Sequence, residues 1–182
     1  MNKRDNKIHP DVVAMINHYK FDQLPVEGTL YKSTYRSSLK LADGSPAGTA
    51  MIGMYSNSPL SVSCFHKLQS DEVWHVYAGD PFLLLLLVED GSMRKILMGN
   101  QPEKGQSVQY TVPANTWQAG YLVEGGRFAL FGCTMAPGFC GKNFLAGTAN
   151  ELIALYPEHQ EIIKKLSVNG HETNMPTGFA DG

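Results

Sequence analysis

The chain has 182 residues, of which 43% are hydrophobic and 18% are charged, and its formal net charge is −2 at pH 7. This size and composition predict one folded domain and exclude a disordered chain, a coiled coil and a collagen-like repeat. Lys and Arg number 15 against 17 Asp and Glu. With no excess of basic residues to neutralise phosphates, we expect no nucleic-acid partner and favour a small-molecule ligand.

The apolar patterning of the sequence predicts neither secretion nor membrane insertion. Residues 1–13 lack the apolar stretch of a secretory signal, and the longest apolar run, Phe82–Val88, is too short to cross a bilayer. We therefore expect a cytoplasmic protein with no membrane contact. The three cysteines show no CxxC spacing, which favours buried thiols over disulfides or structural zinc.

The N-terminal segment, residues 1–23, is predicted to contain a short helix over residues 10–19. Pro10 suits the first helical position, and Asp11 suits the positive end of the helix dipole. Apolar side chains recur on one side of this segment at helical spacing. The helix is therefore expected to cover an apolar surface.

In residues 24–147 the sequence pattern changes to short runs rich in Val, Leu, Tyr, Phe and Thr. Turn pairs such as Asp43-Gly44, Asp90-Gly91 and Gly125-Gly126 separate these runs. The rhythm predicts antiparallel strands in a sandwich or barrel, with no nucleotide-binding βαβ unit.

The strand expected at Phe82–Val88 is apolar at every position, so both of its faces must be covered. One face would fill the barrel interior. The other would lie against terminal helices or a second subunit, and we favour a homodimer because a single small barrel seldom covers its outside so fully.

The C-terminal part of the chain divides into two segments. Residues 148–167 are expected to form two short helices, 151–156 and 157–166, packed on the barrel. Residues 168–182 are polar and without periodicity, which predicts a loose tail.

The densest run of functional residue types lies in residues 65–80. His66, Glu72 and Gly79 have the first-to-last spacing of the first cupin motif, in which two histidines separated by one residue precede a glutamate and a glycine. Residues 105–117 resemble the second cupin motif more weakly. The chain therefore resembles the cupin superfamily.

More narrowly, the chain resembles cupin family 5 (DUF985) from about residue 24 to residue 166. The segments that carry the resemblance, in order, are Pro25–Gly28, Thr34–Ser37, Phe65–Leu68, Ser70–Asp80, Val112–Ala119 and Gly132–Phe139. The resemblance implies a mainly β fold, a single double-stranded β-helix (an RmlC-like jelly-roll barrel) with short N- and C-terminal helices, and a homodimer. It implies no particular reaction, because fold transfers better than function.

A cupin metal site is made of three imidazoles and a carboxylate. In this chain Leu68 stands at the position of the second histidine and Trp117 at that of the last, and neither side chain can donate to a metal. We therefore expect no metal cofactor. The alternative is a divalent metal held by His66 and Glu72 together with ligands that the motif does not predict.

Without a metal, His66 beside Glu72 is a candidate acid–base pair, because a carboxylate stabilises and orients an imidazole. Tyr35, Tyr77 or Tyr110 could act as the complementary acid, since a phenol can donate to a developing enolate, and of these we select Tyr35. Such a group of residues suits epimerisation, isomerisation, dehydration or cyclisation next to a carbonyl. Alternatively, His66 and Glu72 only satisfy each other's polar groups.

Five further residues are candidates for ligand binding. Aromatic and polar side chains could form the walls of a pocket and fix a ligand's orientation: Trp74, Trp117, Gln118, Tyr110 and Arg36. Core packing is the alternative for the tryptophans, and an ion pair for Arg36.

Three functions therefore stay open at this stage. The first is a metal-independent isomerase, epimerase or lyase acting on a carbonyl-containing small molecule. The second is a non-catalytic ligand-binding or sensing protein. The third is an enzyme that depends on a divalent metal held by an atypical ligand set.

Overall fold

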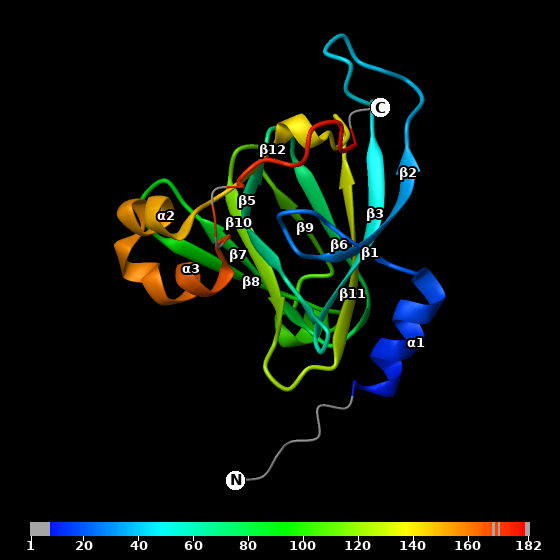
Figure 1. Cartoon of the computed structure of the whole chain (residues 1–182). Helices are drawn as coiled ribbons and strands as arrows, with labels where there is room; N and C mark the ends of the chain where they lie inside the picture. The colour runs from blue at the N-terminus through cyan, green and yellow to red at the C-terminus, as the bar shows by residue number, and fades with distance from the viewer. Residues whose placement is uncertain (1–7, 169, 171, 181–182) are drawn as a thin grey trace.

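The computed structural model describes residues 8–168, 170 and 172–180, and two antiparallel β-sheets face each other in it (Figure 1). Residues 1–7 of the expected N-terminal segment and residues 169, 171, 181 and 182 of the expected tail lie outside the described part. The first sheet contains, in spatial order, β1 (Asp22–Gln23), β2 (Leu30–Arg36), β3 (Thr49–Asn57), β11 (Phe128–Met135), β6 (Glu72–Gly79) and β9 (Gln109–Val112), and β4 (Leu60–Ser61) pairs with β3. The second contains β12 (Phe144–Ala146), β5 (Ser63–Leu68), β10 (Trp117–Leu122), β7 (Phe82–Leu87) and β8 (Met93–Met98).

The chain passes repeatedly from one sheet to the other. After β5, the strands β6, β9 and β11 belong to the first sheet, whereas β7, β8, β10 and β12 belong to the second. This topology is a jelly roll, so the expected mainly β fold with short terminal helices is confirmed. Within the described residues, backbone hydrogen bonds do not close the two sheets into a continuous barrel.

Large apolar side chains fill the space between the sheets. Tyr55 and Phe131 pack with their ring centroids 4.5 Å apart, and Trp74 lies 4.9 Å from Phe131. Phe82 is fully buried beside them. This aromatic core separates one end of the sandwich from the end where the candidate site lies.

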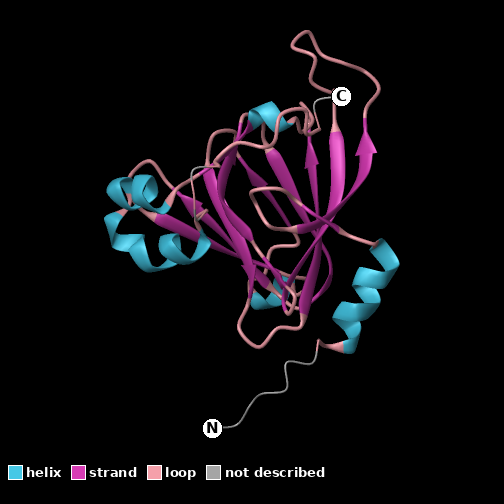
Figure 2. Cartoon of the chain, in the orientation of Figure 1, coloured by secondary structure: helices cyan, strands magenta, loops and turns pink. Residues whose placement is uncertain are grey.

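Helices cover the outer face of each sheet (Figure 2). Helix α1 (Pro10–Tyr19) lies on the first sheet and buries Val12 against Met54 and Leu130. Helices α2 (Ala149–Leu155) and α3 (Gln160–Leu166) lie on the second. None of the helices in the described part is long and apolar enough to span a membrane.

The expectation that β7 is buried on both faces is confirmed. Leu84 and Leu86 point between the sheets, whereas Leu85 and Leu87 pack under α2 and α3. The chain's own helices therefore cover the face for which we considered a second subunit. The homodimer consequently stays a prediction that rests on the family resemblance.

The expected helix boundaries shift by a few residues. Helix α2 begins at Ala149, after a capping box in which the Thr148 side chain accepts from Glu151 N–H and the Glu151 carboxylate accepts from Thr148. Pro157 opens a 3₁₀ turn, η3 (Pro157–His159), and α3 follows it. Two further 3₁₀ turns are η1 (Pro102–Lys104) and η2 (Gly141–Asn143).

The segment expected to be a loose tail is anchored at some of its described residues and exposed at others. Met175 is buried beside Leu68 and Phe144, and the carbonyl of Thr173 accepts a hydrogen bond from Ala146 N–H (2.7 Å). Single apolar anchors of this kind produce no periodicity, so the sequence pattern did not indicate them.

Candidate active site

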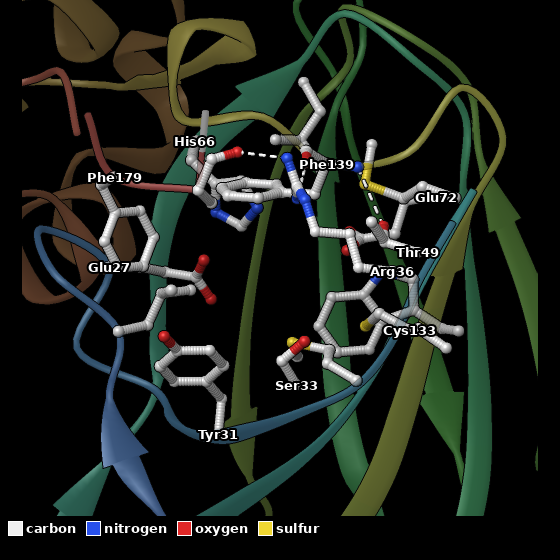
Figure 3. Close-up of a pocket in the computed structure, with 17 residues that line it drawn as sticks. Glu27, Tyr31, Ser33, Arg36, Thr49, His66, Glu72, Cys133, Phe139 and Phe179 are labelled. Carbon is white, nitrogen blue, oxygen red and sulfur yellow. Dashed lines mark hydrogen bonds between the residues drawn. The ribbon is translucent and has the colours of Figure 1, made fainter. Parts of the chain in front are cut away.

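A cavity of about 110 Å³ lies between the sheets, at the end of the sandwich where the C-terminal segment crosses (Figure 3). The first sheet and the loops beside it supply most of its wall. The lining residues are Leu24, Glu27, Tyr31, Ser33, Arg36, Thr49, Ala50, Met51, His66, Leu68, Glu72, Trp74, Cys133, Met135, Phe139, Phe179 and Ala180. Four of the eight residues that we expected at the site are among them: His66, Glu72, Trp74 and Arg36.

His66 lies on β5, almost completely buried, with its ring stacked on Phe144 at a centroid distance of 5.2 Å. Its Nδ1 is 2.8 Å from the backbone carbonyl of Cys64. Because a carbonyl can only accept, Nδ1 carries the hydrogen, and the Nε2 of the neutral ring keeps its lone pair. The imidazole is thus held in one tautomer, with a basic nitrogen available at the cavity wall.

Glu72 lies at the start of β6 and is 7% exposed. Burial raises the pKa of its carboxyl, the nearby His66 lowers that pKa, and the negative charge of Glu27 raises it, with a raised pKa as the result. The described residues show no hydrogen bond between His66 and Glu72. The two groups share the cavity as expected, but the carbonyl of Cys64 orients the imidazole.

A buried pair of side chains holds the Glu72 carboxylate in place. The indole N–H of Trp74 donates to Gln118 Oε1 (3.0 Å), which fixes the direction of the Gln118 amide. The amide nitrogen of Gln118 then donates to Glu72 Oε2 (2.8 Å). Gln118 therefore positions Glu72 from behind, and its polar atoms are used within the protein, although we had expected it to bind ligand directly.

Besides Gln118, three expected site residues do not line the cavity. Side chains alternate along β10, so Trp117 points away from the cavity when Gln118 points inward, and its ring lies 4.8 Å from Lys67 Nζ on the helix side. Tyr35 is 55% exposed, because a bulge in β2 after Ser33 shifts the alternation. Tyr110 packs against the aromatic core and does not line the cavity.

Arg36 lies at the mouth of the cavity, as Figure 3 shows. Its guanidinium donates to the carbonyl of Phe139 (2.8 Å) and to the carbonyl of Ala180 (2.5 Å). The side chain thereby connects β2 to the loop after β11 and to the C-terminal segment. These contacts give Arg36 a role in holding the mouth together.

Glu27 is a cavity residue that our sequence reasoning missed. It lies in the loop between β1 and β2, 8% exposed, and its Oε1 accepts from the hydroxyls of Thr29 and Ser63 at 2.6 Å each. The residues on either side of it, Val26 (φ 64°) and Gly28 (φ 89°), have left-handed backbone conformations. The segment Pro25–Gly28 is one of those that carry the family resemblance, and it places a carboxylate in a turn. That combination was the signal by which Glu27 could have been found in the sequence.

The cavity does not reproduce a cupin metal site. Leu68 lines it at the position of the second histidine, and the oxygen of Gln118 is already bonded to Trp74. In the described part of the chain, no group of three or more His, Cys, Asp and Glu side chains has an arrangement that could hold a metal ion. The residues therefore do not fit the metal that the fold implies, and the lack of a metal cofactor stays a prediction.

Comparison with known proteins agrees with this fold. Residues 13–146 match the family described as Cupin superfamily (DUF985), and the chain belongs to that family. A hypothetical protein from Leishmania major is 28% identical with a TM-score of 0.78, covering 86% of this chain and 98% of its own. A protein from Shewanella oneidensis is 26% identical, also with a TM-score of 0.78, covering 86% of this chain and 97% of its own. No curated protein matches the sequence.

Proposed function

We propose that this cupin binds a small carbonyl compound in the cavity and catalyses a metal-independent, non-redox isomerase, epimerase or lyase step on it. The fixed tautomer of His66 is the observation that carries the proposal. Its Nδ1–H is held by the carbonyl of Cys64, so the lone pair of Nε2 is available for a proton on a bound ligand. Non-catalytic binding would not need a ring fixed in this way.

In the proposed step, His66 Nε2 takes a proton from the carbon next to the carbonyl. The electron pair of the broken C–H bond moves to form an enolate, and Glu72 donates a hydrogen bond to the enolate oxygen. Because burial raises the pKa of Glu72, its acid form persists closer to neutral pH than that of an exposed glutamate. The imidazolium then returns the proton to the same carbon or a neighbouring one, or assists departure of a leaving group.

The first test measures proton transfer without knowledge of the natural substrate. Wild-type protein and His66→Gln are incubated in D₂O with a panel of small keto acids, keto sugars and aldehydes, and proton NMR follows the C–H signals next to each carbonyl. We expect wild-type protein to exchange at least one compound faster than buffer does. His66→Gln should lower that rate by about 100-fold or more, the usual effect of removing a general base.

The matched control is His18→Gln, which changes an exposed histidine on α1. It should exchange deuterium like the wild type, and far-UV circular dichroism should show that all three proteins fold. Undiminished exchange by His66→Gln would show that another group is the base. A compound that binds in the cavity without any exchange would instead support the ligand-binding function.

We also propose that the protein works as a homodimer, the state that the family resemblance implies. Native mass spectrometry would then give twice the chain mass of 20.0 kDa. The same spectrum would reveal any small molecule that is retained during purification.

A further inference from the structure

The cavity presents hydrogen-bond acceptors to a ligand. The carboxylate of Glu27 points into the cavity (Figure 3). Its Oε1 accepts from the hydroxyls of Thr29 and Ser63, whereas Oε2 accepts no hydrogen bond from the described residues. Nε2 of His66 is a second acceptor at the lining of the same cavity. A ligand that matches this site must therefore supply donors.

Hydroxyl groups behind Glu27 hold one of its two carboxylate oxygens. Tyr55 lies 2.6 Å from the Ser63 hydroxyl, so a consistent arrangement has Tyr55 donating to Ser63 and Ser63 donating to Glu27. Thr29 donates the second hydrogen bond to the same carboxylate oxygen. Both hydroxyls donate to the same oxygen, Oε1, so the second oxygen, Oε2, is left for a ligand.

Within the described residues, no side-chain cation lies within 4.0 Å of Glu27. The ion pairs that these residues form lie elsewhere, at the surface near α1. His9 and Arg127 pair with Asp11, and Arg127 also pairs with Asp80. Of the other ionisable groups on the cavity wall, Tyr31 and Cys133 have raised pKa values and stay neutral, and Arg36 is directed to backbone carbonyls at the mouth. A buried carboxylate without a cationic partner is costly, and a cationic ligand would offset that cost.

Aromatic side chains complete the surroundings of Glu27. Tyr31 and Phe179 lie beside its carboxylate in Figure 3, and Trp74 and Phe139 also line the cavity. Aromatic faces attract organic cations, and the combination of aromatic walls with one carboxylate is typical of sites for ammonium groups.

From these observations we infer that the ligand carries a protonated amine, which pairs with Glu27 Oε2 against the aromatic wall. The inference rests on the proposed function and refines its substrate to a small aminocarbonyl compound. The ammonium group would bind at Glu27, and the carbonyl would lie toward Glu72 and His66. A positive charge next to the reacting carbon also favours loss of its proton, which assists the step assigned to His66.

Pairs of compounds that differ in one group test this inference. Aminoacetone is compared with hydroxyacetone, and glucosamine with glucose, and isothermal titration calorimetry measures the dissociation constants at neutral pH. We expect an amine of at least one pair to bind about tenfold more tightly than its hydroxyl partner, or better, a difference of about 1.4 kcal/mol. If neither amine binds, or if both pairs bind equally, the inference is wrong.

Glu27→Gln keeps the size of the side chain and removes its charge, so it should reduce the preference for amines to less than about twofold. Glu103→Gln is the matched control, because Glu103 is exposed in η1 and the change in net charge is the same. If Glu27→Gln does not fold, Glu27→Asp keeps the charge on a shorter side chain and should retain part of the preference. An unchanged preference in folded Glu27→Gln would overturn the assignment.

The outcome is separable from that of the proposed function. His66→Gln should lose deuterium exchange and keep the preference for amines. Wild-type protein that prefers amines but exchanges no proton would contradict the catalytic function alone. Exchange on neutral ketones without any preference for amines would contradict this inference alone.

Discussion

At the scale of single residues, the cavity combines two buried carboxylates with one imidazole, and different neighbours set the state of each. Two hydroxyls hold one oxygen of Glu27, whereas burial raises the pKa of Glu72. His66 is fixed by a backbone carbonyl. Carboxyl groups with such different surroundings can take different roles in one site.

The raised pKa of Glu72 predicts how folding stability depends on pH. The ordinary value is 4.5, and the folded state holds this proton more tightly than the unfolded state does. The stabilising effect of the proton is therefore complete below the unfolded pKa and is lost as pH rises through the folded pKa. Relative to Glu72→Gln, the wild type should lose free energy of unfolding as pH rises from about 4 to about 8.

Urea unfolding of both proteins across this pH range measures the difference. Gln at position 72 can still accept from Gln118, so the substitution chiefly removes the titrating group. Glu124→Gln, at an exposed position, is the control and should follow the wild type. A difference between wild type and Glu72→Gln that does not change with pH, or that changes in the opposite direction, would contradict the raised pKa.

At the scale of elements, helices α2 and α3 explain the strand that is apolar on both faces. Ile163 of α3 is fully buried against Phe65, Leu85 and Leu87. Ile163→Ala should therefore lower the free energy of unfolding by about 2–4 kcal/mol, the range for removing a large core side chain. Lys164→Ala, on the exposed face of the same helix, should change it by less than about 0.5 kcal/mol. Urea unfolding compares them, and a loss below about 1 kcal/mol for Ile163→Ala would show that α3 contributes little.

Sequence reasoning succeeded for elements with a regular pattern. The alternation of apolar residues and turns predicted antiparallel strands in a sandwich or barrel, and the apolar run predicted a strand covered on both sides. The jelly roll itself was implied by the family resemblance. Sequence reasoning was less successful where a shift of one residue along a strand decides which side chains face the cavity. The structure turns Gln118 inward and Trp117 outward, and a bulge takes Tyr35 out of the cavity. Register and bulges depend on pairing between distant strands, which local patterns do not contain.

Residues in loops were the hardest to predict. Glu27 reaches the cavity because a turn with two left-handed residues directs it there, and Phe179 reaches it because the C-terminal segment folds back over the mouth. His66 and Glu72 were found because the cupin motif places both on strands. Side chains on loops have no such periodic position, so only the assembled structure brings them to the site.

At the scale of the whole molecule, a cupin metal site needs donors from strands of both sheets. This chain supplies His66 from the second sheet and Glu72 from the first, but Leu68 and Gln118 occupy other inward positions without free donors. Two donors bind a divalent ion weakly, because tight sites use three or more protein ligands. The arrangement of the sheets is therefore retained, while the residues at their shared cavity do not match the three imidazoles and one carboxylate of a cupin metal site.

The resulting prediction concerns metal content and its removal. Protein purified without chelators or a histidine tag should contain less than about 0.1 equivalent of iron, manganese, nickel or zinc, and EDTA should leave its thermal midpoint and its deuterium exchange unchanged. Leu68→His is the comparison variant, because it places a third donor on β5, two residues from His66, and should raise zinc affinity. Stoichiometric metal in the wild type, or loss of exchange after EDTA, would show that the cavity recruits ligands beyond His66 and Glu72. Binding of zinc by Leu68→His alone would show that one side chain separates this cavity from a metal site.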